Sequence, residues 1–407
     1  MKLAAILLTL SLPALAGDWP QWRGANRDDN STETGLLKQW PAEGPKQAWL
    51  FEKAGMGYAG FSIVAGQLFT LGTRDGKEIL LAIDEKTGNE LWATPIGDLY
   101  TEQRGDGPRS TPTVDADRVY AMSGRGNLTC AQAKDGKILW EKSMKDLGGS
   151  VPHWGFTESP LVDGNLVLCT PGGDQGTMAA LDKMTGAPVW QSAEITEGAQ
   201  YSSIIPATMN GKKQYVQFVM QTLFGVDAAT GKLIWRSPWS AGRTAIIPTP
   251  IVKGDEVFIS SGYGAGCKKV KVNGSEATDV FMNKDLENHH GGVILVGDYV
   301  YGHSKGGWTC MSFADGSVKW TDKGVGKGAM AYADGMFYCV GEKSGEVALI
   351  EASPSGWNEK GRFKLAPQSP DRSPQGAVWV HPVIANGKLY LRDQNYIYCY
   401  DVKTTTP

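Results

Sequence analysis

Four of the five histidines in the chain lie in short polar segments that also carry tryptophan, arginine, lysine or glutamate. An imidazole can bind a metal, move a proton or hold an anion, and indole and guanidinium groups add stacking and charge. Ten residues of these and related types are the candidate binding residues of the sequence. They are Arg109, His153, Trp154, Glu158, Tyr201, Arg243, His289, His290, Lys327 and His381.

The arrangement of the histidines does not favour a metal centre. A zinc site needs three or four ligands, some of them usually at a short fixed spacing. His289 and His290 are adjacent, and adjacent residues of an extended strand point to opposite faces. The two side chains therefore cannot both bind one ion if this segment is extended. We expect no metal ligand and no catalytic residue, and ligand binding is the chemistry that the ten residues favour.

A repeated phrase that ends in tryptophan must position these residues. Asp-x-x-Thr-Gly precedes Trp92, Trp190 and Trp235, and looser copies precede Trp140 and Trp320. In every copy the glycine lies four residues before the tryptophan, and the first four tryptophans are 48, 50 and 45 residues apart. A period in this range is typical of stacked sheet units.

Each unit has the pattern of four strands joined by tight turns. The repeated phrase itself predicts a hairpin turn, because Asp can bond to the backbone of the turn and Gly takes a positive φ. A tryptophan is too large for one small sheet to bury, so we expect it to pack between neighbouring sheets. Four antiparallel strands per unit without crossover helices predict the blade of a β-propeller.

The number of blades follows from the ends of the fourth strands, which lie near Trp92, Trp140, Trp190, Trp235, Phe281, Trp320 and Phe363. Only three strands follow Phe363, while one unpaired strand, residues 46–51 with Trp49, precedes the first unit. We expect this strand to close the last blade, which would remove two open sheet edges. The prediction is an all-β, eight-bladed propeller of four-stranded antiparallel blades. Seven blades are the alternative, and the Phe281 unit departs most from the repeat.

The N-terminus predicts export. Residues 1–16 combine a positive start, a short apolar run and small residues before position 17, the pattern of a cleaved signal peptide. No cysteine follows the apolar run, so a lipoprotein anchor is not expected, and no later stretch is long and apolar enough to span a membrane. We expect an N-terminal arm over residues 17–45, the propeller over 46–402 and a tail over 403–407.

The arm contains Trp19, Trp22 and Trp40 among Gly, Asn and Asp residues. Exposed together, these rings would form an unusual apolar patch. We therefore expect the arm to lie across the side or the mouth of the propeller and to bury them. A mobile arm that docks a partner is the alternative.

The six cysteines are expected to be buried free thiols. Cys130, Cys310 and Cys399 occupy the position that Ala82 and Ala180 have in other units. This position accepts small residues, and a cysteine there behaves as a small apolar group. Disulfide pairing, which an exported protein allows, stays open.

The charge of the chain does not indicate nucleic-acid binding. There are 40 Lys and Arg residues against 43 Asp and Glu residues, a net charge of −3, whereas nucleic-acid binding needs a clustered basic face. We interpret the most basic run, Cys267 to Lys271, as an exposed strand face.

The Ala-x-Asp-x-x-Thr-Gly-x-x-x-Trp phrase resembles the repeat of pyrroloquinoline-quinone-type propellers. That superfamily includes quinoprotein alcohol dehydrogenases and the outer-membrane assembly propeller lipoprotein. Four longer segments resemble a group of exported bacterial quinoprotein-like propellers: residues 18–24, 153–155, 289–292 and 349–354. The resemblance covers essentially the whole mature chain and implies the propeller fold.

The resemblance implies how a cofactor would be held if the chain were like the catalytic relatives. In those enzymes a quinone lies beneath a vicinal disulfide and is stacked on a tryptophan. A calcium ion is held there by carboxylate and amide ligands, and an aspartate acts as base. This chain has no adjacent cysteines, and it is shorter than those enzymes by roughly a domain's worth of insertions. Trp154, Arg109 and Glu158 are the nearest candidates for stacking, quinone anchoring and calcium ligation.

We therefore predict an exported, periplasmic or secreted propeller that acts as a binding or scaffold module in the bacterial envelope. Its partner would be a protein or a polysaccharide that contacts the channel mouth, where loops from all blades converge. We expect a monomer without a cofactor, and a binding protein rather than an enzyme. The alternative is an oxidoreductase that uses pyrroloquinoline quinone with calcium to act on an alcohol or a sugar. A third hypothesis is binding of a sugar or polymer at the same mouth.

Overall fold

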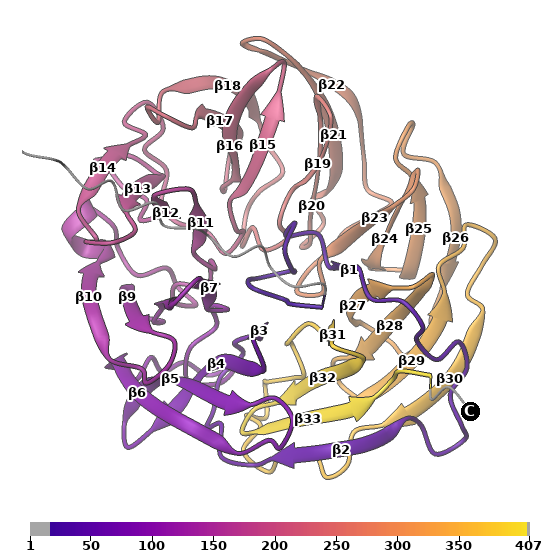
Figure 1. The fold of residues 1–407 in the computed structure, drawn as a ribbon. Helices are drawn as coiled ribbons and strands as arrows, with labels where there is room; N and C mark the ends of the chain where they lie inside the picture. Colours follow the sequence, from indigo (N-terminus) through magenta and orange to yellow (C-terminus); the bar gives the residue numbers. More distant parts are fainter. Residues whose placement is uncertain (1–16, 405–407) are drawn as a thin grey trace, which may run out of the picture.

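In the computed structural model, which describes residues 17–404, eight small sheets stand around a central channel (Figure 1). The predicted all-β, eight-bladed propeller is therefore confirmed, and the seven-bladed alternative is wrong. The predicted signal peptide, residues 1–16, and the last three residues of the predicted tail lie outside the described residues. No helix within residues 17–404 is long and apolar enough to cross a membrane.

Every blade contains four antiparallel strands, and the first strand of each lies nearest the channel (Figure 1). Blade 1 consists of β3 (Ser62–Val64), β4 (Gln67–Arg74), β5 (Lys77–Asp84) and β6 (Glu90–Asp98), and blade 2 of β7 (Thr113–Asp115), β8 (Arg118–Met122), β9 (Asn127–Gln132) and β10 (Ile138–Ser143). Blade 3 consists of β11 (Leu161–Asp163), β12 (Leu166–Cys169), β13 (Ala179–Asp182) and β14 (Pro188–Gln191), and blade 4 of β15 (Ile205–Met209), β16 (Lys212–Phe218), β17 (Thr222–Asp227) and β18 (Leu233–Pro238).

The second half of the ring repeats this order. Blade 5 consists of β19 (Ile251–Lys253), β20 (Glu256–Ser261), β21 (Gly266–Asn273) and β22 (Glu276–Asn283), and blade 6 of β23 (Val293–Val296), β24 (Tyr299–Ser304), β25 (Gly307–Ser312) and β26 (Val318–Asp322). Blade 7 consists of β27 (Gly328–Ala333), β28 (Met336–Gly341), β29 (Glu346–Glu351) and β30 (Glu359–Lys364), and blade 8 of β31 (Val383–Ala385), β32 (Lys388–Asp393), β33 (Tyr396–Asp401) and β2 (Lys46–Phe51). The short strand β1 (Asn30–Ser31) adds to β27 in parallel, and η1 (Met144–Leu147), a 3-10 helix, follows β10.

The two ends of the chain close the ring. Strand β2 pairs antiparallel with β33, and Trp49 lies opposite Cys399 in that pairing. Figure 1 shows β2, in indigo, at the outer edge of the yellow C-terminal strands. The predicted closure of the last blade by the N-terminal strand is thus confirmed, and it leaves no blade with an unpaired third strand.

The repeated tryptophans pack between blades, as predicted. The indole Nε1 of Trp140 in blade 2 donates a hydrogen bond of 3.0 Å to the carbonyl of Lys183 in the turn of blade 3. Its ring lies against Gly186 of that turn, which has a φ of +72° and where a Cβ atom would be 2.7 Å from the ring. The same hydrogen bond joins Trp49 to Glu85, Trp92 to Ala133 and Trp320 to Ser353.

Three of the six cysteines lie opposite tryptophans of the repeat: Cys130, Cys310 and Cys399. Cys130 lies directly opposite Trp140 across the strand pair, and Cys310 lies opposite Trp320 in the same way. A larger residue at this position would collide with the indole on the neighbouring strand. All six cysteines are buried and free, which confirms the prediction of free core thiols.

Blade 5 departs from the repeat, as the Phe281 unit predicted. Lys269 lies opposite Phe281, at the position that holds a small residue opposite the repeated tryptophans. The side chains of Lys268 and Lys269 are only 4% and 3% exposed, and they pair with Asp279 at 2.6 Å and Glu256 at 3.1 Å. The interpretation of this run as an exposed strand face is therefore wrong. Lysine stems are long enough to be buried between sheets while their ammonium groups reach carboxylates.

The N-terminal arm enters the central channel, where Figure 1 shows it in indigo beside β1. Trp19 pairs with Ile63 at the start of blade 1, and Leu36 pairs with Lys403 near the C-terminus. Trp19 and Trp40 are buried, which confirms that the arm buries these two rings. The passage of the arm through the channel was not predicted.

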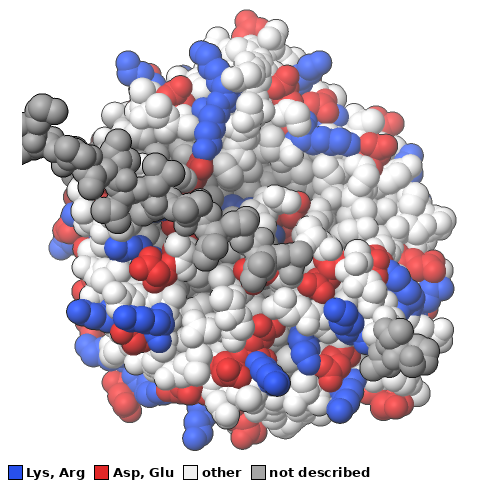
Figure 2. Space-filling model, in the orientation of Figure 1, with Lys and Arg blue, Asp and Glu red and all other residues white. Residues whose placement is uncertain are grey.

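Charged side chains are interspersed over the face of the ring that Figure 2 shows. Lys and Arg residues alternate there with Asp and Glu residues, and neither sign forms one continuous patch.

We predict that Gly186→Ala lowers the free energy of unfolding by about 2–5 kcal/mol, because it adds strain at positive φ to a clash with Trp140. Gly211→Ala is the matched control, since Gly211 has a φ of +73° and no atom within 4 Å of its added Cβ. Its cost is about 1–2 kcal/mol. Urea unfolding of the two variants measures the difference, and equal losses would show that the contact between blades contributes nothing.

Candidate functional site: a cavity at one mouth of the channel

The N-terminal arm divides the channel because two of its arginines are buried against opposite walls. Arg27 donates to the carbonyls of Ser159 at 2.7 Å and Pro160 at 3.1 Å, just before blade 3. Arg23 pairs with Asp29 at 2.6 Å and donates to the carbonyl of Val293 in blade 6. A buried guanidinium is tolerated only when such partners are present, so these bonds fix the path of the arm.

A cavity lies on each side of this arm. One is lined mainly by the segments that precede the first strands of the blades, and we call it the mouth cavity. The other is lined by the first strands themselves, including residues 205–208 and 250–252, and by the opposite side of the arm.

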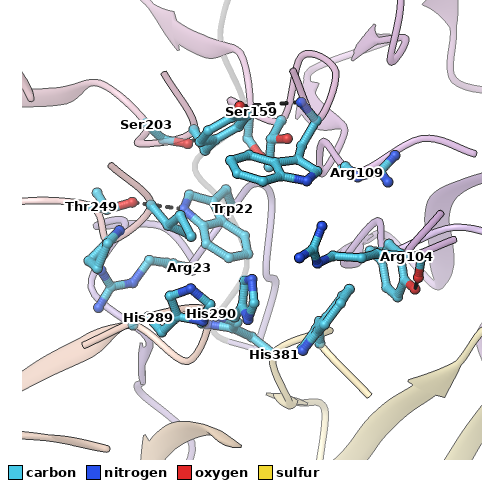
Figure 3. Close-up of a pocket in the computed structure, with 18 of the residues that line it drawn as sticks. Trp22, Arg23, Arg104, Arg109, Ser159, Ser203, Thr249, His289, His290 and His381 are labelled. Atoms are coloured by element: carbon cyan, nitrogen blue, oxygen red, sulfur yellow. Dashed lines mark hydrogen bonds between the residues drawn. The ribbon is translucent and has the colours of Figure 1, made fainter. Parts of the chain in front are cut away.

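The mouth cavity has a volume of about 330 Å³ and receives residues from the approach to every blade. Seven of the ten candidate binding residues line it: Arg109, Trp154, Tyr201, His289, His290, Lys327 and His381. Figure 3 shows the arm residues Trp22 and Arg23 facing the histidines from one side, with Arg104 on the other. Propeller geometry brings these seven together because first strands of all blades begin at the same end of the channel.

The other three candidate binding residues do not line the cavity. His153 is exposed, and its ring lies edge-on to Trp154 with 4.6 Å between centroids. Arg243 is also exposed. Glu158 lies inside the channel wall, where it accepts hydrogen bonds from Thr170 N at 2.5 Å and Thr170 Oγ1 at 2.9 Å.

Several lining residues were missed by the sequence reasoning: Trp22, Arg23, Tyr58, Arg104 and Tyr263. Trp22 and Arg23 belong to the arm, whose path the repeat does not encode. Arg104 lies in the same loop as the candidate residue Arg109, and this position in the sequence could have identified Arg104 as a lining residue. Tyr263 lies in a glycine-rich run, and a large aromatic residue among glycines is itself a sign of a surface loop with a role.

The histidines of the cavity are held by specific neighbours. Lys327 Nζ lies 2.7 Å from His289 Nδ1. An ammonium group only donates, so Nδ1 accepts and the neutral ring carries its proton on Nε2. Burial lowers the pKa of His289 to about 2, and the nearby charges of His290 and Lys327 act in the same direction. His381 contacts Asp29 Oδ2 at 3.2 Å and the carbonyl of His290 at 2.8 Å.

The residues present do not fit a quinone held with calcium. No group of three or more His, Cys, Asp or Glu residues within residues 17–404 is arranged to hold a metal ion. Glu158, the candidate calcium ligand, is already bonded to Thr170 inside the wall. All six cysteines are free, and none is adjacent to another. The mouth cavity therefore lacks both the carboxylate ligands and the disulfide that such a site uses.

One further segment matches the Gly-x-Ser-x-Gly sequence pattern of a nucleophile elbow: Gly302-His303-Ser304-Lys305-Gly306. A nucleophile elbow needs a turn from a strand into a helix, whereas here β24 turns into β25. Ser304 Oγ donates to the carbonyl of Asp285 at 3.0 Å and accepts from Glu287 N at 2.9 Å. The serine is buried and joins two loop segments, so its role is structural.

A family model described as outer membrane protein assembly factor BamB matches residues 75–322, more than half of the chain. The chain belongs to this family. It is a PQQ-like β-propeller related to BamB and to quinoprotein alcohol dehydrogenases, as its repeat predicts.

BamB of Shewanella oneidensis is 22% identical over 251 residues, which cover 58% of this chain and 56% of that protein. BamB of Kangiella koreensis is 28% identical over 197 residues, which cover 47% of this chain and 45% of that protein. The chain thus spans about half the length of the curated relatives that it matches.

Two solved structures show the same architecture. BamB from Moraxella catarrhalis gives a TM-score of 0.61 at 16% identity and covers 89% of this chain and 98% of that chain. Quinohemoprotein alcohol dehydrogenase from Comamonas testosteroni gives a TM-score of 0.54 at 12% identity and covers 96% of this chain and 81% of that chain. At these identities the likeness shows the fold alone.

We predict that Glu158→Gln removes a part of the pH dependence of stability. Burial raises the pKa of Glu158 from 4.5 to about 7, against the opposing effects of Thr170 and Arg27. Unfolding therefore releases a proton between pH 4.5 and 7, and wild-type stability falls over this window by up to about 3 kcal/mol because of this group. Above pH 7 the loss is complete, and below pH 4.5 it is absent.

Urea unfolding at pH 4.5, 6, 7 and 8 measures this effect as the difference between variant and wild type. That difference should grow in favour of the variant up to pH 7, whereas Glu43→Gln, at an exposed position, should give a constant difference. Parallel profiles for wild type and Glu158→Gln would contradict a raised pKa at Glu158.

We also predict that pyrroloquinoline quinone with calcium does not bind tightly to the purified protein. The expected titration of tryptophan fluorescence and quinone absorption is flat at micromolar concentrations, because the mouth cavity offers no carboxylate set for the calcium ion. Saturable binding, with reduction of a dye when an alcohol or a sugar is added, would support the oxidoreductase instead.

Proposed function

We propose that the chain is a binding module of the bacterial envelope, periplasmic or secreted, which holds a ligand or partner in the mouth cavity and acts without catalysis. One observation carries this proposal: the cavity of about 330 Å³ receives residues from the approach to every blade and from the arm. Concave sites with many aromatic residues and a few convergent polar groups are the usual form of ligand sites.

The lining of the cavity supports binding by stacking. Six tryptophan and tyrosine rings contribute to it: Trp22, Tyr58, Trp154, Tyr201, Tyr263 and Trp379. Aromatic side chains give a large contact area and lose little conformational entropy when a partner is bound. They are also among the residues that contribute most to binding energy in interfaces.

The carboxylates of the cavity support a role without catalysis. Glu102 is paired with Arg109 at 3.0 Å, and Glu342, beside the cavity, is paired with Lys327 at 3.4 Å. A general base must accept a proton from the substrate. Carboxylates that are held by cations are poor bases, because the neighbouring positive charge favours the ionised form.

Family membership and the predicted signal peptide support an envelope location. The relatives are named as outer membrane protein assembly factors, and their location and scaffold role are carried to this chain as part of the proposal. A closed ring of blades suits such a role, since a rigid scaffold presents loops in a fixed arrangement.

We predict that a photo-reactive amino acid at Tyr263 cross-links the partner in envelope fractions. Tyr263 is 49% exposed and lines the mouth cavity. Val189 on β14, which is 53% exposed and outside the cavity, is the control position. Electrophoresis and mass spectrometry should detect an adduct from position 263 and none of the same mass from position 189.

A pair of threonine variants tests whether the adduct depends on the cavity. Thr157→Trp fills the mouth cavity, whereas Thr208→Trp places the same ring in the cavity on the opposite side of the arm. The adduct from position 263 should fall about tenfold in the first variant and persist in the second. An adduct that is unchanged in both variants would show that the partner binds elsewhere.

A further inference from the structure

The cations of the mouth cavity are matched by carboxylates with one exception. The matched pairs are Arg23 with Asp29, Arg109 with Glu102, and Lys327 with Glu342. Arg104 has no ion pair with any residue of the described chain, 17–404. Its guanidinium carbon lies 5.6 Å from the centroid of the Trp154 ring, and the side chain extends toward the middle of the cavity (Figure 3). The cavity therefore carries one unbalanced positive charge, on a group that binds a carboxylate through two parallel hydrogen bonds.

The approaches to blades 3 and 4 add hydroxyl donors to the cavity lining, from Ser159 and Ser203. Ser159 Oγ accepts from Thr111 N at 2.9 Å, and Ser203 Oγ accepts from Ser159 N at 3.1 Å. Neither hydroxyl donates a hydrogen bond to another described residue. Because each oxygen already accepts a backbone N–H, its own hydrogen is the group that remains for a ligand.

Two ring N–H groups of the lining add to these donors. Trp154 Nε1 and His289 Nε2 are buried and have no hydrogen-bond partner among the described residues. An unpaired buried donor is unfavourable, so an acceptor oxygen of a ligand that reaches either group would remove this cost. The lining thus favours a ligand with several acceptor oxygens distributed around it.

The aromatic rings that line the cavity are inclined to one another and do not form two parallel faces. Neighbouring rings are inclined by 58° for Trp154 and Tyr201 and by 46° for Tyr58 and Trp379. Trp22 is inclined by 53° to His381. Two nearly parallel rings would be needed to hold a flat aromatic ligand between them. Rings inclined at these angles instead surround a puckered ring, whose C–H groups point in several directions.

We infer that the mouth cavity binds a sugar acid: a puckered, hydroxylated ring that carries one carboxylate. The carboxylate pairs with Arg104, the hydroxyl oxygens accept from the serine hydroxyls and ring N–H groups, and the C–H faces pack on the inclined rings. This inference rests on the proposed function and names its ligand class. The ligand in the envelope is a uronic acid residue of a polysaccharide.

Other ligands match fewer of these features. A neutral sugar leaves Arg104 without an anion. A sugar phosphate brings a second negative charge at neutral pH, which the remaining cations do not balance because each already has a carboxylate partner. A flat aromatic acid uses Arg104 but leaves the hydroxyl and N–H donors unpaired.

Calorimetric titration of the purified full chain tests the inference with three related probes: sodium glucuronate, glucose and glucose 6-phosphate. Glucuronate should bind, and glucose should bind about tenfold more weakly or not at all, because it lacks the charged hydrogen bonds to Arg104. Glucose 6-phosphate should also bind more weakly than glucuronate. Equal affinities for glucuronate and glucose, or tighter binding of glucose 6-phosphate, would overturn the inference.

Two arginine variants locate the effect. Arg104→Gln should weaken glucuronate binding about tenfold or more, because the exposed side chain supplies the unpaired charge. Arg243→Gln removes an arginine that is also exposed but lies outside the cavity, and it should leave the affinity unchanged. Thermal unfolding confirms that both variants are folded. If both variants lose affinity equally, the binding reflects overall charge and the inference fails.

The outcome also separates this inference from the proposed function. If the cross-link at Tyr263 depends on the cavity but glucuronate does not bind, the ligand class is wrong and the binding role stands. If neither is observed, both proposals fail.

Discussion

Most blades of this propeller are joined to the next by an aromatic ring that lies on the neighbour's turn, usually an indole and in blade 5 the ring of Phe281. Trp140 shows the elements of the contact: a ring against Gly186, an indole N–H bonded to the carbonyl of Lys183, and the small Cys130 on the strand behind it. Each element constrains the others, since a larger residue at either small position would displace the ring. The contact is repeated with local variation around the ring, so the sequence of one blade is not independent of the next.

Closure of the ring depends on the same contact. Trp49 comes from β2 at the N-terminal end, completes the blade formed by the C-terminal strands, and bonds to Glu85 in blade 1. The last join therefore uses the same indole hydrogen bond as the joins made by Trp92, Trp140 and Trp320, although its strand is separated from its blade by more than 300 residues. Closure leaves each blade with only short, protected edges, and it holds the approaches to the first strands in fixed positions.

The mouth cavity is a consequence of this fixed arrangement and of the arm. Arg23 and Arg27 bond to blades 6 and 3 and so hold Trp22 at the floor of the cavity. Most charges there are matched internally, which leaves Arg104 as the group that selects the charge of a ligand. The relation to BamB and to quinoprotein alcohol dehydrogenases is a relation of architecture, and the chemistry of the mouth is set by this chain's own loops.

The sequence by itself determined the blades: the period of the tryptophans, the small residues opposite them and the orphan strand with Trp49 were sufficient for an eight-bladed ring. It also placed ten candidate residues at one mouth, because each lies at or before a first strand, and seven of them line the cavity. Only the tertiary structure decided that Glu158 lies inside the wall, that Lys268 and Lys269 are buried in pairs, and that the arm enters the channel. The reason is physical. The repeat reports contacts between neighbouring strands and blades, which recur at a fixed spacing, whereas burial at the channel depends on arm and loop contacts that occur once and have no period.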